Sequence, residues 1–99
     1  MGRYLVIWEV EKAHIPVDPK ERGEAYSLLM AVTKQDIEKG LIKEWSVEVG
    51  GSRGYNYVEG TEIEVSNMIQ QFVPYINVQV IPLATFSQTE EVVKGLAGN

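Results

Sequence analysis

The chain has 99 residues, 44% of them hydrophobic, which is enough for one core, so we expect a single domain spanning residues 1–99. Its formal net charge is −5 with nine scattered Lys and Arg residues, a balance that argues against nucleic acid and anionic membranes as partners. There is no cysteine, which excludes disulfides, thiolate metal sites and cysteine nucleophiles.

The beginning of the chain is dense in β-forming residues. Residues 4–10 are apolar almost throughout, which is typical of a central strand covered on both faces. No basic region with a following apolar run precedes this segment, and no stretch approaches about eighteen apolar residues. We therefore expect a cytoplasmic protein.

A strong helix start follows a short linker. Asp18 supplies a cap, Pro19 occupies the first helical position, and Glu21 lies three residues after the cap. Gly40 is a C-terminal stop, so a helix is predicted over about residues 19–39. The apolar residues expected to share its buried face are Ala25, Leu28, Leu29, Val32 and Ile37.

The middle of the chain has the pattern of a β-hairpin. Apolar and polar residues alternate over residues 41–49, which is typical of a half-buried strand. Residues 50–54 are rich in glycine and predict a turn, and residues 55–59 form a returning strand. With a turn of residues 50–53, the strands would be joined by three pairs: Glu48 with Tyr55, Ser46 with Tyr57, and Glu44 with Glu59. A turn one residue longer would reverse the tyrosines relative to the glutamates.

A second helix and a last strand follow the hairpin. Thr61 and Glu64 form a capping box, and the apolar stripe after them consists of Val65, Met68, Ile69 and Phe72. Residues 76–81 are rich in β-branched residues and lie between Pro74 and Pro82, which predicts a strand at the sheet edge with one free side. A weaker capping box, Ser87 to Glu90, predicts a short C-terminal helix.

The order strand, helix, strand, strand, helix, strand is the ferredoxin-like arrangement, an α+β fold with a four-stranded antiparallel sheet and two helices on one face. The other face is then open. The residues predicted to line a ligand site there are Leu5, Ile7, Glu9, Ser46, Glu48, Tyr55 and Tyr57. Because this face is too apolar to be left wet, we expect two copies to pair face to face, with any small organic ligand between them.

Three residues on or near this face are candidates for acid–base chemistry. His14, the only histidine, is either a loop-packing residue or a general base at the mouth of the pocket. Glu44 facing Glu59 would be a like-charge pair. Either both carboxylates are solvated at the rim of the face, or one of them has a raised pKa and acts as a base. One histidine excludes a multi-histidine metal site within one chain, and we expect neither metal nor cofactor. Tyr55 and Tyr57 either orient a ligand through their hydroxyls or pack across the strands.

Three stretches of this chain resemble the dimeric α+β barrel proteins, and within them the muconolactone isomerase group and related small uncharacterised domains. These stretches are residues 4–10, Gly40 with the strand ending at Gly50, and residues 74–83. The resemblance covers nearly the whole chain and implies a homodimer. In the isomerase it implies proton removal beside a lactone carbonyl by a carboxylate or imidazole base. This chain departs from that pocket in offering Glu44, Ser46 and Glu48 in place of basic and aromatic groups.

Three functions remain open. The first is a homodimeric module that binds a small organic molecule between its sheets, and the second is a cofactor-free isomerase or oxygenase that uses a glutamate or His14. The third is a structural or assembly subunit without catalysis. A cavity lined by Glu44, Tyr55 and Tyr57 would favour the first two, whereas a face filled by side chains would favour the third.

Overall fold

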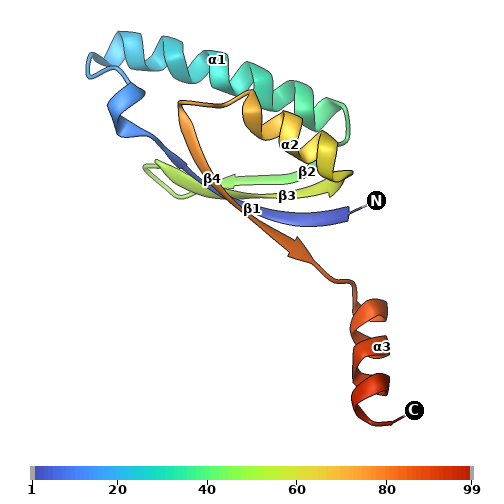
Figure 1. Ribbon diagram of the computed structural model, residues 1–99. Helices are drawn as coiled ribbons and strands as arrows, with labels where there is room; N and C mark the ends of the chain where they lie inside the picture. The colour runs from blue at the N-terminus through green and yellow to red at the C-terminus, as the bar shows by residue number, and fades with distance from the viewer. Residues whose placement is uncertain (1, 99) are drawn as a thin grey trace.

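The structure, a computed structural model, describes residues 2–98 and contains a four-stranded sheet with a layer of helices on one face. Its elements are β1 (Gly2–Val10), the 3-10 turn η1 (Lys12–His14), α1 (Pro19–Glu38), β2 (Ile42–Val47), β3 (Arg53–Gly60), α2 (Glu62–Gln70), β4 (Ile76–Leu83) and α3 (Phe86–Leu96). The strands form an antiparallel sheet in the order β2-β3-β1-β4. Helices α1 and α2 cover one face, and α3 projects from the other side (Figure 1). The predicted α+β, ferredoxin-like arrangement is confirmed at this level.

The central strand has the predicted facing. Val6, Trp8 and Val10 of β1 are buried beneath the helices, whereas Ile7 and Glu9 are exposed on the opposite face. The strand alternates in this way because successive side chains point to opposite sides of a pleated sheet. Its inward residues join a core whose buried members are Val6, Ile42, Val58, Val65 and Met68. The predicted edge strand is also confirmed, since β4 pairs with β1 at the end of the sheet and Pro82 lies opposite Tyr4.

The ends of α1 are as predicted, but its buried face is only partly so. The Asp18 carboxylate accepts a hydrogen bond of 3.1 Å from the Glu21 amide, and Gly40 has a φ of +80°, which favours glycine. Leu28 and Ile37, both expected to be buried, are 72% and 46% exposed, whereas the other three residues of the predicted face are half-buried. The fully buried residues of α1 are Thr33 and Asp36. The prediction was wrong there because apolar residues occupy more than one side of this helix, so apolarity alone does not identify the inward side.

The hairpin register differs from the predicted one by two residues. Glu44 lies opposite Tyr57, and Ser46 opposite Tyr55, so the predicted pairing of Glu44 with Glu59 is wrong. The cause is a turn that lies one residue earlier than predicted: the Glu48 amide donates to the Arg53 carbonyl oxygen at 2.8 Å, which leaves residues 49–52 between the strands. Because a shift of two residues preserves side-chain parity, both tyrosines still lie on the face away from the helices.

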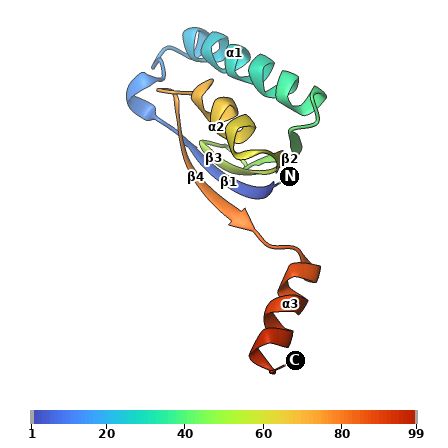
Figure 2. The same cartoon turned by 45° about the vertical axis from the view of Figure 1, so that its right-hand side comes forward.

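Helix α3 begins earlier than predicted and lies away from the rest of the chain. Its cap is Thr85, whose hydroxyl oxygen accepts from the Gln88 amide at 3.0 Å, so the predicted cap at Ser87 is wrong. No residue of α3 is buried, and the principal extents of the chain are 61 × 24 × 20 Å (Figure 2). Among residues 2–98, no helix is long and apolar enough to cross a membrane.

Candidate functional site

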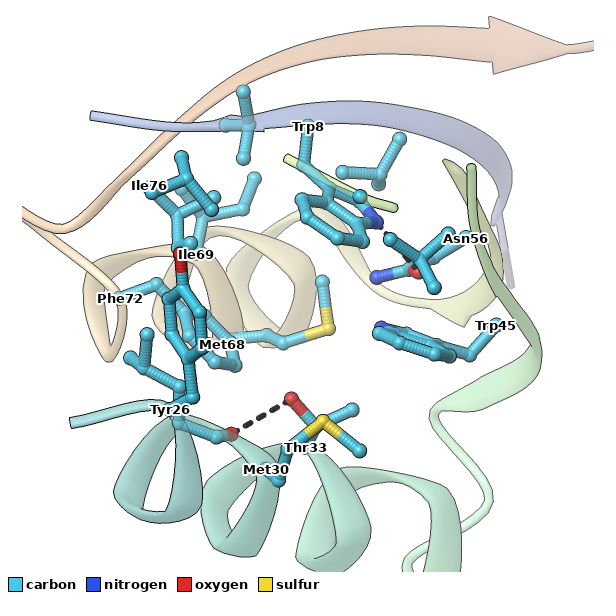
Figure 3. Close-up of a pocket in the computed structure, with 16 residues that line it drawn as sticks. Trp8, Tyr26, Met30, Thr33, Trp45, Asn56, Met68, Ile69, Phe72 and Ile76 are labelled. Atoms are coloured by element: carbon cyan, nitrogen blue, oxygen red, sulfur yellow. Dashed lines mark hydrogen bonds between the residues drawn. The ribbon is translucent and has the colours of Figure 1, made fainter. Parts of the chain in front are cut away.

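An apolar cavity of about 260 Å³ lies between the helices and the sheet (Figure 3). We call it the inner cavity and define it by six of its residues: Trp8, Tyr26, Met30, Trp45, Met68 and Phe72. None of the sixteen described residues that line it is charged. The inner cavity therefore suits an uncharged, largely apolar molecule, because a charge buried there would have no counter-ion.

Two stacked tryptophans form one wall of the inner cavity. The rings of Trp8 and Trp45 are stacked, with centroids 5.7 Å apart and planes at 20°. Gly54 permits this arrangement, since a Cβ there would collide with the Ser46 carbonyl oxygen and lie 2.6 Å from Cζ2 of Trp8. The result is a flat, rigid aromatic surface facing the cavity, and such surfaces favour offset stacking of another ring.

One amide supplies the polar group of this wall. Asn56 is buried on β3, and its Oδ1 accepts a hydrogen bond of 3.2 Å from Nε1 of Trp8. Because that bond fixes the amide, the amide nitrogen points into the space between Trp8 and Trp45 (Figure 3). The other polar side chain that lies deep in the lining, Thr33, donates its hydroxyl to the Leu29 carbonyl oxygen at 2.9 Å. Asn56 is thus one donor available to a molecule in the cavity, and the Tyr26 hydroxyl is another polar group of the lining.

Sequence analysis did not identify the inner cavity. Trp8 is buried and Trp45 partly buried, as is usual for core residues, and the space between the two layers has no sequence signal of its own. Asn56 did carry a signal, because it has the same parity as the fully buried Val58 on β3. A polar side chain at an inward position needs a partner, and here the partner is the Trp8 indole.

The face opposite the helices, called the open face, carries the residues predicted to bind a ligand. Leu5 lies opposite Tyr57, and Ile7 opposite Tyr55, on the two middle strands. Glu9, two residues after Ile7, is exposed on the same side of β1. A shallow hollow of about 390 Å³ is lined there by Ile7, Ser46, Glu48 and Tyr55 together with Val47, Arg53 and Gly54. Four of the seven predicted residues therefore share one depression.

Polar side chains on the open face are paired with one another. The Tyr55 hydroxyl donates to Oε1 of Glu44 at 2.9 Å, and Nε of Arg3 donates to the Tyr57 hydroxyl. The Arg3 guanidinium carbon also lies 5.4 Å from the centre of the Tyr57 ring, within the range of a cation–π contact. Arg3 is a cation that sequence analysis missed, although its parity with Leu5 on β1 indicates this face.

The three candidate acid–base residues do not come together within one chain. Glu44 binds Tyr55, whereas Glu59 lies opposite Arg3 near the start of β1. His14 lies in η1, beyond the far end of β1, with its ring edge-on to Tyr75 at 6.4 Å. Arg3, which lies opposite Glu59, is seven residues from Val10, a separation of about 23 Å along β1. His14 and Glu59 therefore cannot act on one small molecule in a single chain.

A carboxyl group outside both pockets is buried without a partner. Asp36 on α1 is 2% exposed, and its Oδ2 has no hydrogen-bond partner among the described residues. Burial raises the pKa of Asp36, and the nearby Lys39 opposes that effect. Asp36 lines neither pocket. We therefore treat it as a determinant of stability.

Within residues 2–98, no three His, Asp or Glu side chains are grouped so as to hold a metal ion. No family model matches the sequence, and no curated protein matches it either.

Proposed function

We propose that this protein binds a small, uncharged, planar organic molecule in the inner cavity. The observation that carries the proposal is the cavity itself, about 260 Å³ of apolar space between the helices and the sheet. Protein interiors are close-packed and contain few voids larger than a water molecule. The cavity is partly open to solvent, since Met30 of its lining is 51% exposed, so a ligand can enter it and bury apolar groups that otherwise lack contacts on that side.

The lining indicates the class of ligand. An apolar cavity of about 150 Å³ accommodates benzene, so the inner cavity has room for one or two fused rings. The stacked Trp8 and Trp45 favour a planar ring system, and the Asn56 amide can donate to one acceptor atom on it. The absence of charged lining residues among those described disfavours a carboxylate or an ammonium ion.

The two tryptophans provide the assay, because they are the only ones in the chain and both line the cavity. Titration with 2-naphthol should change their fluorescence and saturate, whereas 2-naphthoate, which is charged at neutral pH, should bind more weakly by at least about tenfold. Saturation by neither compound, or equal affinity for both, would contradict the proposal.

A matched pair of variants on α1 tests whether 2-naphthol binds in the inner cavity. Met30 lines the cavity, so Met30→Trp fills part of it and should weaken 2-naphthol binding by about tenfold or more. Leu28 lies two residues away and is mainly exposed, so Leu28→Trp adds the same side chain outside the cavity and should leave affinity unchanged. Equal effects of the two variants would place the binding elsewhere.

We propose in addition that two copies pair through their open faces, as in the dimeric α+β barrel proteins that the sequence resembles. Ile7 and Tyr55 at the centre of this face are 41% and 40% exposed, and Leu5, Tyr57 and Ile81 share it. Burial of such side chains is the usual driving force for association of a sheet face. Ile7→Glu should dissociate the pair in sedimentation equilibrium, whereas Glu9→Gln at the margin should not. A wild-type chain that is monomeric at about 1 mM would refute the pairing.

Acid–base catalysis on the open face is the second candidate function. The observation that favours it is the hydrogen bond between Tyr55 and Glu44, with the Arg3–Tyr57 pair on the same face. A carboxylate can remove a proton beside a lactone carbonyl, and a phenol or guanidinium can stabilise the resulting enolate. Turnover of an unsaturated lactone that is lost in Glu44→Gln would support this function, and absence of turnover in the wild-type protein would exclude it for that substrate.

A further inference from the structure

Helix α3 is an amphipathic helix with no packing partner in its own chain. It leaves the end of β4 and extends away from the body on the side opposite α1 and α2 (Figures 1 and 2). Phe86 and Leu96 are 81% and 84% exposed, and Val92 and Val93 are mostly exposed as well. These four residues, called the α3 stripe, lie along one side of the helix at helical spacing.

Such a helix is not expected to persist without a partner. Isolated helices shorter than about 12–15 residues are marginal in water, and α3 has 11 residues. Its interior contains Gly95 and two adjacent valines, all of which lower intrinsic helix stability. The capping box of Thr85 and Gln88 fixes where the helix starts but supplies only about 1 kcal/mol. The rest of the free energy that keeps α3 helical must therefore come from packing of the α3 stripe.

The surface of the chain shows how much area remains to be covered. A compact monomer of 11.1 kDa is expected to expose about 5,700 Å², whereas this chain exposes 6995 Å². Its radius of gyration is 16.7 Å, against about 12.6 Å for a compact domain of this length. The excess of about 1,300 Å² exceeds the roughly 800 Å² per partner that a standard interface buries. The area left uncovered thus matches what a stable dimer needs.

We infer that the α3 stripe packs on a second copy of this chain, so that each α3 is an arm clasping its partner. This inference rests on the open-face pairing proposed above. Because α3 projects on the side of the open face, a copy that approaches this face also approaches the helix (Figure 1). A lipid surface is the less favoured occupant, because α3 carries Glu90 and Glu91 against a single Lys94, whereas membrane-surface helices are typically rich in Lys and Arg.

Two matched double variants of the full chain test this inference in sedimentation equilibrium. Val93→Gln with Leu96→Gln makes the α3 stripe polar, and should raise the dimer Kd by about 100-fold or more because each change acts in both copies. Glu91→Gln with Lys94→Gln introduces the same two side chains on the opposite side, preserves the net charge, and should leave the Kd unchanged. The body should stay folded in both, since α3 contributes no buried residue.

The outcomes separate this inference from the open-face pairing. An unchanged Kd in the stripe variant overturns the role of α3, while dissociation by Ile7→Glu still supports the open face. Loss of the dimer in the stripe variant but not in Ile7→Glu supports the arm and refutes the open-face pairing. Hydrogen exchange gives a second reading: amides of residues 90–96 should be protected at high protein concentration and lose protection on dilution. Rapid exchange at every concentration, or protection that appears only with lipid vesicles, overturns the inference.

Discussion

Replacement of Asp36 by asparagine is expected to stabilise the protein at neutral pH. The Asp36 carboxyl is 2% exposed and has an oxygen without a hydrogen-bond partner among the described residues, and Asn has nearly the same shape. A buried polar group left unpaired costs about 1–3 kcal/mol, and more when it is charged. Because the amide keeps polar atoms in the same place, we expect Asp36→Asn to recover about 1–2 kcal/mol at pH 7. In a domain of this size, each kcal/mol raises Tm by about 4–8 °C.

The pH dependence of this gain follows from the direction of the pKa shift. Burial raises the pKa of Asp36 in the folded state above the ordinary value of 3.8. The folded protein therefore retains this proton in a pH range where the unfolded chain has lost it. Its stability falls as pH rises from the ordinary value through the raised one. Asp36→Asn lacks this loss, so its advantage should be full at pH 7 and should disappear in acid, where Asp36 is protonated in both states.

Urea unfolding of wild type and variant from pH 3 to pH 7 measures this difference directly. The control is Glu38→Gln, on the same helix and exposed, which should change stability by no more than about 0.5 kcal/mol at any pH. A variant that is less stable than wild type at pH 7, or a gain that persists undiminished in acid, would refute the assignment of Asp36 as a buried carboxyl without a partner.

Three further substitutions test individual contacts. Gly54→Ala should destabilise the protein by about 1–3 kcal/mol and shift the near-UV circular dichroism of the stacked tryptophans, because the added Cβ meets Trp8 and the Ser46 carbonyl; an unchanged spectrum would contradict the packing. Thr61→Ala removes the cap of α2 and should cost about 1 kcal/mol in chemical denaturation, against little loss for Thr61→Ser, which keeps a capping hydroxyl. Glu48→Gln breaks an exposed ion pair with Arg53 and should change the unfolding free energy by less than about 1 kcal/mol, so a larger loss would show that the pair is structurally important.

Local sequence patterns were sufficient for the elements and for most of their facing. The caps at Asp18 and Thr61 are formed by the side chains that the sequence indicated, since a cap depends only on residues three positions apart. On β1 the residues predicted to face outward, Ile7 and Glu9, are exposed. The hairpin register was wrong by two residues because the position of the turn depends on which glycine adopts a positive φ, and the chain offers several in residues 50–54.

The candidate site was less accessible to sequence reasoning, because it depends on distances between layers. Every residue that defines the inner cavity is an ordinary core type, so nothing in the pattern distinguishes a filled core from one with space for a ligand. The position of α3 is equally a matter of tertiary structure. Its apolar spacing was visible at Val92, Val93 and Leu96, but a helix with that pattern normally packs on its own domain, whereas this one extends away from it.

The most direct test of the central claim is a set of intermolecular nuclear Overhauser effects between bound 2-naphthol and methyl groups of the protein. The inner cavity predicts contacts from the ligand protons to the methyl groups of Met30 and Met68, and none to Ile7 on the open face. Contacts to Ile7 without any to Met68 would contradict the account, because they would place the ligand on the opposite side of the sheet.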